Sequence, residues 1–563
     1  MASIKHRIKQ TTSTRKGKII FFSIIAFILA LLAAAILYWQ LNKKGIIRGK
    51  LKSAIEEKSQ GLYKVHYDNL DLDEVSGFLS VTNFSLQYDS ILYQQMLKKN
   101  EAPPILFSIQ IPKITINGVK TPRALIDKEI SGNTLSIQQP TIEVIYTLAG
   151  KDSARNIPTK EVYEQILGGL NQIELDTVLL SDAVIKTKYL GKEKSGVEIN
   201  NATIQLTDIR IDSIANEDKT RLLFSKTIEA SFGQLTWLSD NKLYKFSIDD
   251  FQLSSVQNYL SVGAFAIQPQ LNENSFVQAL PTQDDRFDGE TKNIRIKNIN
   301  FQSLLNENII ADSIIVESAR LNIYRDLNIK RDTKNRVGTY PHQAIAKIPL
   351  PVMVKNIFVK NAFVEYKERS ISTGKTGKVQ FYNSSALVKN FTNDTAAIRA
   401  NNLMSVDINT RFLNKTPLHT LWSFYLNNPN GRFDIKGSMG ALPATAVNPL
   451  AEPMGPARIE DGTIKSLEFT LSGHDYGMDG SVRLLYEGLK VSVLKQDEDT
   501  KKLDKKGLAS FAANILIKND NPSGKDDPRV TAVHFDRNTN RSIFHLSWKT
   551  LFKGIKETVG IKK

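Results

Sequence analysis

Few residues of this 563-residue chain occur in patterns that could carry out chemistry. Gly374, Lys375 and Thr376 have the order found at the end of a phosphate-binding loop. That loop needs another glycine five positions before Gly374, and Arg369 stands there instead. The segment therefore predicts a hairpin turn and no phosphate site.

A second segment imitates a calcium-binding loop, which takes oxygen ligands at fixed positions. Asn519, Asn521, Ser523 and Gly524 fit several of these positions. The first ligand is Asn, however, and the twelfth position is Val530, where the loop needs a glutamate. We expect a solvated loop without metal.

The remaining patterns also argue against catalysis. The seven histidines include no pair at the helical spacing of a metal site, and no Gly-x-Ser-x-Gly motif occurs. The chain has no cysteine, which excludes thiolate nucleophiles, disulfides, iron-sulfur clusters and cysteine-based zinc sites. We expect no enzymatic activity, no cofactor and no metal.

Composition predicts a globular body, because hydrophobic residues make up 41% and charged residues 23% of the chain. The net charge of +16 is concentrated at one end, since residues 1–52 hold eleven basic residues and no acidic one. The rest of the chain is nearly balanced and shows no basic stripe with stacking aromatics. We therefore expect no nucleic-acid partner.

The basic N-terminal residues flank an apolar run, 19–39, which is long enough to cross a membrane as a helix. Tyr38 and Trp39 end the run where aromatic residues sit at the lipid headgroups. A cleaved signal peptide is the alternative, with Ala33 and Ala35 as its small residues, but the run continues past them. We predict an uncleaved anchor.

The anchor divides the chain into unequal parts. A basic tail, 1–18, is short enough to stay in the cytoplasm, whereas a long C-terminal body translocates largely regardless of its charge. We therefore predict a single-pass membrane protein whose body lies outside the cytoplasm. Apolar residues at helical spacing predict an amphipathic linker over 40–60, followed by the body, 61–540.

The body has short apolar runs of period two, separated by turn residues, which predict β-strands. Helices are expected over 91–97 and 159–170. Within the strands a pattern recurs in which apolar residues alternate, pass an Asn or Asp, and alternate again. Its five copies are Leu79, Val81, Asn83, Phe84, Leu86; Ile204, Leu206, Asp208, Ile209, Ile211; Phe246, Ile248, Asp250, Phe251, Leu253; Ile294, Ile296, Asn298, Ile299, Phe301; and Val352, Val354, Asn356, Ile357, Val359.

This pattern contains a step of three residues, which would place its two halves on opposite faces of a regular strand. A β-bulge or tight bend at the Asn or Asp would return all four apolar side chains to one face, because these residue types tolerate left-handed dihedral angles. The alternative is a series of ordinary strand ends with Asx turns.

A longer repeat relates two parts of the chain about 180 residues apart and indicates an elongated, repetitive sheet. One residue is deleted after the fourth position of the second copy. The first copy comprises Ile114, Ile116, Leu125, Ile130, Leu135, Ile137, Ile142 and Val144, and the second comprises Ile294, Ile296, Leu305, Ile310, Ile314, Val316, Leu321 and Ile323.

The order of these features resembles the AsmA-like proteins, relatives of TamB and of the chorein-type bridge-like lipid transfer proteins. The resemblance begins with the anchor and continues in the stretch 77–86, which is similar to the opening strand of that family. Further similar residues are Ile114, Leu125, Ile130, Pro140 and Ile142, then Asn448, Pro449, Leu450, Pro453, Gly455, Ile459, Gly462, Ile464, Gly473, Gly477, Gly480, Leu484, Tyr486, Leu489 and Val491.

The resemblance implies a mainly β fold, in which a long, curved antiparallel sheet forms an open apolar groove that projects from the inner membrane into the periplasm. It implies that the protein conveys phospholipid between membranes and supports outer-membrane biogenesis, with the outer membrane as a second partner. The alternation of apolar residues in the strands independently supports such a groove, because the apolar face of a sheet must be covered by protein or by other apolar molecules. The lining candidates are Val81, Leu86, Ile204, Leu206, Ile209, Ile211, Ile294, Ile296, Ile299, Val352, Val354 and Ile357.

A rival function uses the same fold. An anchored scaffold would bind envelope assembly proteins and assist outer-membrane protein assembly by strand addition along an open sheet edge, without lipid transport. The two functions differ in whether the apolar interior or an unpaired edge strand is the working surface.

The C-terminal residues 541–563 predict a basic amphipathic helix. Such a helix can lie on an anionic membrane surface, and here Trp548 and Phe552 would enter the lipid while Lys549 and Lys553 face the headgroups. It can equally fold back as a cap over the last strands. The sequence leaves both alternatives open.

Overall fold

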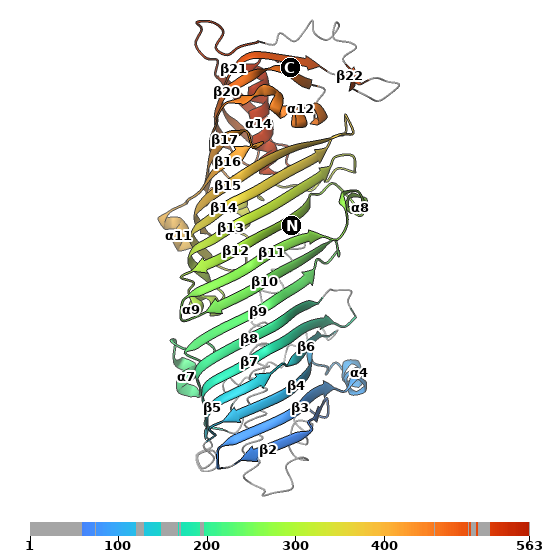
Figure 1. Ribbon diagram of the computed structural model, residues 1–563, viewed down its shortest axis with the longest axis vertical. Coiled ribbons are helices and arrows are strands. Elements are labelled where there is room, and N and C mark those ends of the chain that lie inside the picture. The colour runs from blue at the N-terminus through green and yellow to red at the C-terminus, as the bar shows by residue number, and fades with distance from the viewer. Residues whose placement is uncertain are drawn as a thin grey trace. The chain divides into compact units, whose positions relative to one another are not determined.

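The computed structural model describes residues 59–561, except for 74, 120–128, 148–166, 168–169, 192–195, 455–456, 494, 497–502 and 505–517 (Figure 1). The predicted tail and anchor and nearly all of the predicted linker lie outside these residues. Within the described part, no helix is both long and apolar enough to cross a membrane. The chain divides into two compact units, the first holding residues up to 265 and 298–307, the second 266–297 and 308 onward.

The first unit is a sheet of mainly antiparallel strands. Both β1 and β2 pair with β3, β3 pairs with β4, and β7 to β10 follow one another in antiparallel order. Its elements are β1 (Tyr63–His66), β2 (Asn69–Asp73), β3 (Phe78–Tyr88), α4 (Ser90–Lys98), β4 (Ile105–Asn117), β5 (Glu129–Gln138), β6 (Thr141–Tyr146), β7 (Gln172–Tyr189), β8 (Val197–Ile211), α7 (Ser213–Glu217), β9 (Thr227–Leu238), β10 (Tyr244–Ser254) and α9 (Phe301–Leu305), while β11 (Tyr259–Pro269) begins here and ends in the second unit.

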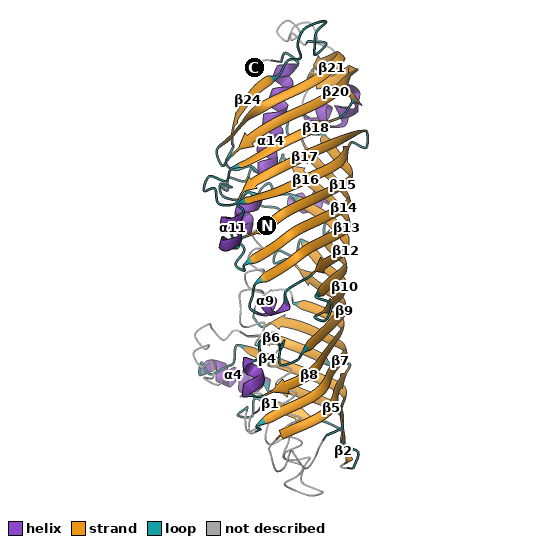
Figure 2. Ribbon diagram, turned by 90° about the vertical axis from the view of Figure 1, so that its left-hand side faces the viewer, coloured by secondary structure: helices purple, strands orange, loops and turns teal. Residues whose placement is uncertain are grey.

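The second unit is also a mainly antiparallel sheet, and Figure 2 shows its long helix α14 lying across the strands. Its elements are α8 (Glu273–Gln278), β12 (Arg286–Lys297), β13 (Ile309–Asp326), α10 (Pro341–Ile345), β14 (Val352–Arg369), β15 (Thr376–Thr392), α11 (Thr395–Ala400), β16 (Leu403–Phe412), β17 (Thr416–Tyr425), β18 (Phe433–Met439), β19 (Leu442–Pro443), η2 (Ala444–Val447), α12 (Asn448–Met454), β20 (Ala457–Gly473), β21 (Gly477–Val493), β22 (Lys495–Gln496), β23 (Leu503–Asp504), β24 (Thr531–Asp536) and α14 (Ile543–Thr558).

The antiparallel pairing that we expected dominates both units, but each unit departs from it at one place. In the first unit β5 and β6 run parallel to β7, and in the second β13 runs parallel to β14. The offset is 43 residues in both, with Glu129 beside Gln172 and Ile309 beside Val352. Parallel neighbours need a long crossover connection, which is present here between β6 and β7 and between β13 and β14.

The predicted repeat follows this shared arrangement. Its first copy lies on β4, β5 and β6, and its second on β12, α9 and β13, while Leu125 lies outside the described residues. The parallel strand that follows the repeat begins at Gln172 in the first unit and at Val352 in the second, about 180 residues later. The repeat predicted from eight apolar positions therefore extends over the parallel crossover that follows them.

Three predictions concern short segments of the chain, and two of them are confirmed. Helix 91–97 is confirmed by α4, which begins after the N-cap Asp89. The predicted helix 159–170 lies almost wholly outside the described residues. The hairpin at Gly374 is confirmed, because this residue has a φ of 65° in the turn between the antiparallel strands β14 and β15.

Asparagine and aspartate residues bend several strands where the sequence predicts it. Asn83, Asp208 and Asp250 lie inside β3, β8 and β10 with φ angles of 51°, 50° and 54°. The register is unchanged on either side of each of these bends, so both partner strands bend together and no bulge occurs there. β7 and β8 do shift register further along, between Leu180 and Ile185. The bend is confirmed at these three positions.

The other two copies of the pattern differ. Asn298 has a φ of 53° but follows Lys297, the last residue of β12, so a strand end is correct there. Asn356 lies inside β14 without a left-handed conformation, and the left-handed residue of that strand is Asn361, with a φ of 50°.

The bend has the expected effect on the side chains. In β3 the residues before and after Asn83 belong to one core cluster, although a step of three separates the two pairs. Leu79, Val81, Phe84 and Leu86 are each 5% exposed or less.

One bend continues across neighbouring strands of the first unit. Asn201, with a φ of 54°, faces Gly233, which in turn faces Asp250 on the other side. A side chain added at Gly263 would place its Cβ 2.8 Å from the Cβ of Asp250. Glycines therefore allow the bent backbones to approach one another closely.

We predict that Asn201→Val lowers the free energy of unfolding by about 1–2 kcal/mol, because a β-branched residue is strained at positive φ. Asn201→Gly is expected to cost less than about 0.5 kcal/mol. The neighbouring Asn200→Val, at an ordinary strand position, serves as the control. Thermal unfolding of the detergent-purified full-length chain measures all three, and equal midpoints for the two valine variants would contradict the role of the bend.

Candidate functional site

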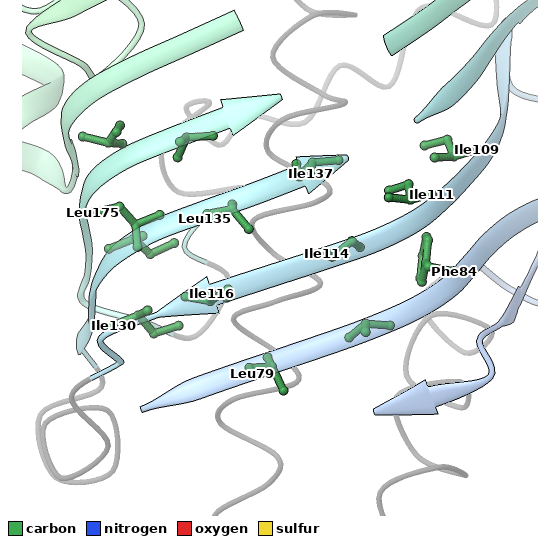
Figure 3. Packing of buried hydrophobic residues seen from close by; sticks show 14 of the residues in the cluster. Leu79, Phe84, Ile109, Ile111, Ile114, Ile116, Ile130, Leu135, Ile137 and Leu175 are labelled. Atoms are coloured by element: carbon green, nitrogen blue, oxygen red, sulfur yellow. The ribbon is translucent and has the colours of Figure 1, made fainter. Parts of the chain in front are cut away.

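The candidate site is the side of each unit's sheet that carries the rows of apolar side chains. We call this side the apolar face of that unit. In the first unit it is formed by one side of β3, β4, β5 and β7, and Figure 3 shows its side chains gathered over these strands. Cross-strand partners such as Leu79 and Ile116, or Val81 and Ile114, place apolar side chains in rows that run from strand to strand.

Most candidates in the first unit are core residues. Val81, Leu86, Leu206, Ile209 and Ile211 are between 1% and 5% exposed and belong to the same cluster. Ile204 is half-buried and packs at the margin of that cluster. The structure therefore brings all six candidates together on one face and buries five of them.

The apolar face becomes more accessible toward β9 and β10. Phe232 and Phe251 stack with ring centroids 4.6 Å apart, and Trp237 and Phe246 stack at 5.1 Å. Three of these four rings are half-buried, Phe246 being the buried one. Leu235 pairs with both Ile199 and Ile248 in the same rows.

In the second unit the candidates lie in similar rows. Ile294 pairs with Val316, and Ile296 pairs with Ile314, which lies beside Ile357 on β14. All five side chains are half-buried. Val352 and Val354 start the same strand and are 5% and 2% exposed.

One lining prediction is wrong. Ile299 is 3% exposed, but it follows the end of β12 and precedes α9, whose N-cap is Asn300. Its backbone N–H bonds to the carbonyl of Asn258, 3.2 Å away. The strand ends before Ile299 because Asn298 turns the chain, so this residue packs at a helix start and belongs to the first unit.

Part of the apolar face of the second unit is covered by residues 336–348, which we call the inner segment. Tyr340 and Ile345 belong to the core cluster of β16–β21, together with Phe424 and Phe433. The ring of Tyr340 meets that of Phe433 edge-on at 5.2 Å. The inner segment thus fills space against strands that would otherwise present apolar side chains.

A buried ion pair holds the inner segment in place. Arg537 Nη1 donates to Asp475 Oδ1 at 2.9 Å, with both side chains under 5% exposed. The guanidinium of Arg537 also lies 4.2 Å from the ring centre of Tyr340. Asp475 accepts further bonds from the backbone N–H of Gly338 and from Gln343 Nε2, at 3.1 and 2.7 Å.

The same segment buries a histidine. His342 is 2% exposed, and neither ring nitrogen has a hydrogen-bond partner among the described residues. Its ring lies 5.2 Å from that of Phe424. Burial lowers the pKa of His342 to about 4, with the carboxylate of Asp475 acting in the opposite direction.

The C-terminal helix is a cap, as one of the two alternatives predicted. α14 packs against β21 and β24, burying Ile543, Leu546 and Thr550. Gly554 allows the closest approach, because a Cβ there would lie 2.5 Å from Cγ2 of Val482. The helix is therefore part of the folded second unit.

The membrane-surface candidates lie on the other side of this helix. Trp548 and Phe552 are 42% and 39% exposed and stack at 5.6 Å. Lys549 is exposed, and Lys553 Nζ bonds to the carbonyl of His534 at 2.7 Å. Contact of this side with a membrane stays a prediction.

Sequence reasoning missed the inner segment and its ion pair. Asp475 and Arg537 are separated by 62 residues and carry no local pattern that would join them. It also missed the apolar residues of β9, for which period-two alternation at Ile228, Ala230 and Phe232 was an available signal. No group of metal-ligating residues occurs among those described.

Neither protein-family models nor curated protein sequences gave a match to this chain.

We predict that acid weakens the second unit through His342. Its folded-state pKa of about 4 lies below the unfolded value of about 6.5, so the unfolded state binds the proton first as the pH falls. Stability is full above pH 6.5 and decreases toward pH 4, by up to about 3 kcal/mol. His342→Leu should flatten this decrease in thermal unfolding of the full-length chain. The exposed His66→Leu is the control, and an unchanged slope in His342→Leu would contradict the assignment.

We also predict that Gly554→Leu displaces the cap, because the new side chain collides with buried Val482. Overpacking of this kind costs about 1–3 kcal/mol. Trypsin should then cleave after Lys553 and Lys556 faster than in the parent chain. Phe552→Leu, on the exposed side of the same helix, should leave cleavage unchanged. Equal cleavage of Gly554→Leu and the parent would show that the contact does not hold the cap.

Proposed function

We propose that the protein binds phospholipid on the apolar faces of its sheets and conveys it between membranes in support of outer-membrane biogenesis. The single observation that supports this most is the set of half-buried apolar rows that continue from strand to strand, as in Ile296, Ile314 and Ile357. A sheet face of this kind needs an apolar cover, and lipid acyl chains match its composition.

The proposal places the chain in the inner membrane through the predicted anchor, 19–39, with the body in the periplasm as an AsmA-like open groove. The outer faces of the strands are consistent with contact to water. On β12, Lys297 is exposed, while Ile294 and Ile296 on the opposite face are half-buried. No covalent chemistry is required of any residue in this function.

The scaffold alternative receives less support. Strand addition needs a long, accessible edge strand. The first strands along the chain, β1 and β2, and the last, β24, each have one described partner and are short, with four, five and six residues. β24 is in addition contacted by α14.

We predict that Ile296→Asp lowers the phospholipid recovered with the purified chain about twofold or more, because a carboxylate in an apolar surface loses its hydration. The detergent-extracted full-length protein is analysed by mass spectrometry, with lipid counted per chain. Lys297→Asp is the matched control, since it introduces the same group one residue away on the outer face.

Equal lipid in the parent chain, Ile296→Asp and Lys297→Asp would rule out this part of the apolar face as the binding surface. Lipid no higher than in an unrelated β-protein would contradict the proposed function itself and favour the scaffold.

A further inference from the structure

Basic residues gather at one end of the apolar rows in the second unit. Arg325 lies near the end of β13, Arg331 follows that strand, and Arg541 and His545 lie at the start of α14. We call these four residues the basic cluster. They come from two distant parts of the chain, the end of β13 with the loop after it and the start of α14, so no local sequence pattern joins them.

A buried glutamine holds these parts together. Gln283 is 4% exposed, and its Nε2 donates to the carbonyls of Leu327 and Ile329 at 2.8 and 3.0 Å. Its Oε1 accepts from Arg541 Nη1 at 3.3 Å. Gln283 therefore fixes the loop that carries Arg331 next to the start of α14.

Two nearby carboxylates already have partners, and one of these partners belongs to the basic cluster. Asp285 pairs with Arg325 Nε at 2.7 Å, and Glu368 accepts a hydrogen bond from the hydroxyl of Tyr366 at 2.6 Å. Among the described residues, no carboxylate lies within ion-pair distance of Arg541. Burial, followed by the charges of Arg325 and Arg331, lowers the pKa of Arg541, while Glu368 acts in the opposite direction.

The basic cluster lies at the end of the apolar rows, on the same face of the strands. Ile323 on β13 pairs with Tyr366 on β14, and two residues further Arg325 pairs with Glu368 on the same face. Leu321 and Val364 form the row before them. An amphipathic molecule lying along these strands would therefore meet apolar side chains and then positive charge.

We propose that Arg541, Arg325 and Arg331 bind the phosphate of a phospholipid headgroup, while the acyl chains lie on the adjoining apolar rows. This inference rests on the proposed function and adds a specific place for the headgroup. Arginine is suited to the task, because its guanidinium offers a planar set of donors that matches phosphate oxygens. His545 stays neutral near pH 7, since burial and the charge of Arg541 lower its pKa to about 4.

The test measures binding of soluble probes to the full-length chain held in amphipol, by titration calorimetry. The probes are dihexanoyl phosphatidylglycerol, dihexanoylglycerol, which lacks the phosphate, and inorganic phosphate. Arg541→Gln is expected to weaken phosphatidylglycerol binding about fivefold to tenfold and to leave dihexanoylglycerol binding unchanged. Arg331→Gln should weaken phosphatidylglycerol binding about twofold to threefold; Arg331 is exposed, so this variant can be interpreted even if Arg541→Gln destabilises the fold.

Arg399→Gln, at an exposed position in the last turn of α11, is the matched control and should behave as the parent. If phosphatidylglycerol binds the parent and both cluster variants equally, the headgroup site is overturned while the proposed lipid function stands. If inorganic phosphate binds in an Arg541-dependent way and neither lipid binds, the phosphate source is not lipid and both proposals fail in that form. Equal loss of both lipids in Arg541→Gln would assign the residue to the fold.

Discussion

A β-strand alternates its side chains between two faces, and this alternation must survive over strands as long as the 18 residues of β7, β13 and β14. Left-handed asparagine and aspartate residues interrupt it, as at Asn83 in β3. Because the partner strand bends at the facing position, hydrogen bonding continues in the same register and the apolar residues return to one face. Without these bends half of each apolar pattern would point to water.

An apolar face of this size creates a second requirement, which is that something must cover it. In the first unit most of the lining is buried in one core cluster, where residues such as Leu86 and Leu206 are 1% and 3% exposed. In the second unit the inner segment and α14 cover the strands from β16 onward. The rows around Ile296 and Ile357 remain half-buried, and the proposed function assigns the acyl chains to them.

Sequence reasoning reached those features that a local pattern encodes. The bends at Asn83, Asp208 and Asp250, the repeat over β4 and β12 and the two-sided helix α14 all follow from residue type and spacing. Strand direction does not, because an alternating strand has the same period in parallel and antiparallel pairs, and this concealed the parallel neighbours β13 and β14. The pair of Asp475 and Arg537 was equally hidden, since only the fold brings them together.

The buried polar groups explain why the inner segment takes one defined position on the apolar face of the second unit. An ion pair such as Arg537 with Asp475 contributes little net stability, because desolvation offsets its attraction, yet leaving either partner alone is costly. It therefore admits one placement of the inner segment, whereas apolar contacts around Tyr340 alone would tolerate several. The same reasoning applies to Gln283, whose three bonds position Arg541 and the loop before Arg331. In the proposed function the apolar rows hold acyl chains, and a few buried polar side chains decide where those rows are covered by protein and where they end beside charged residues.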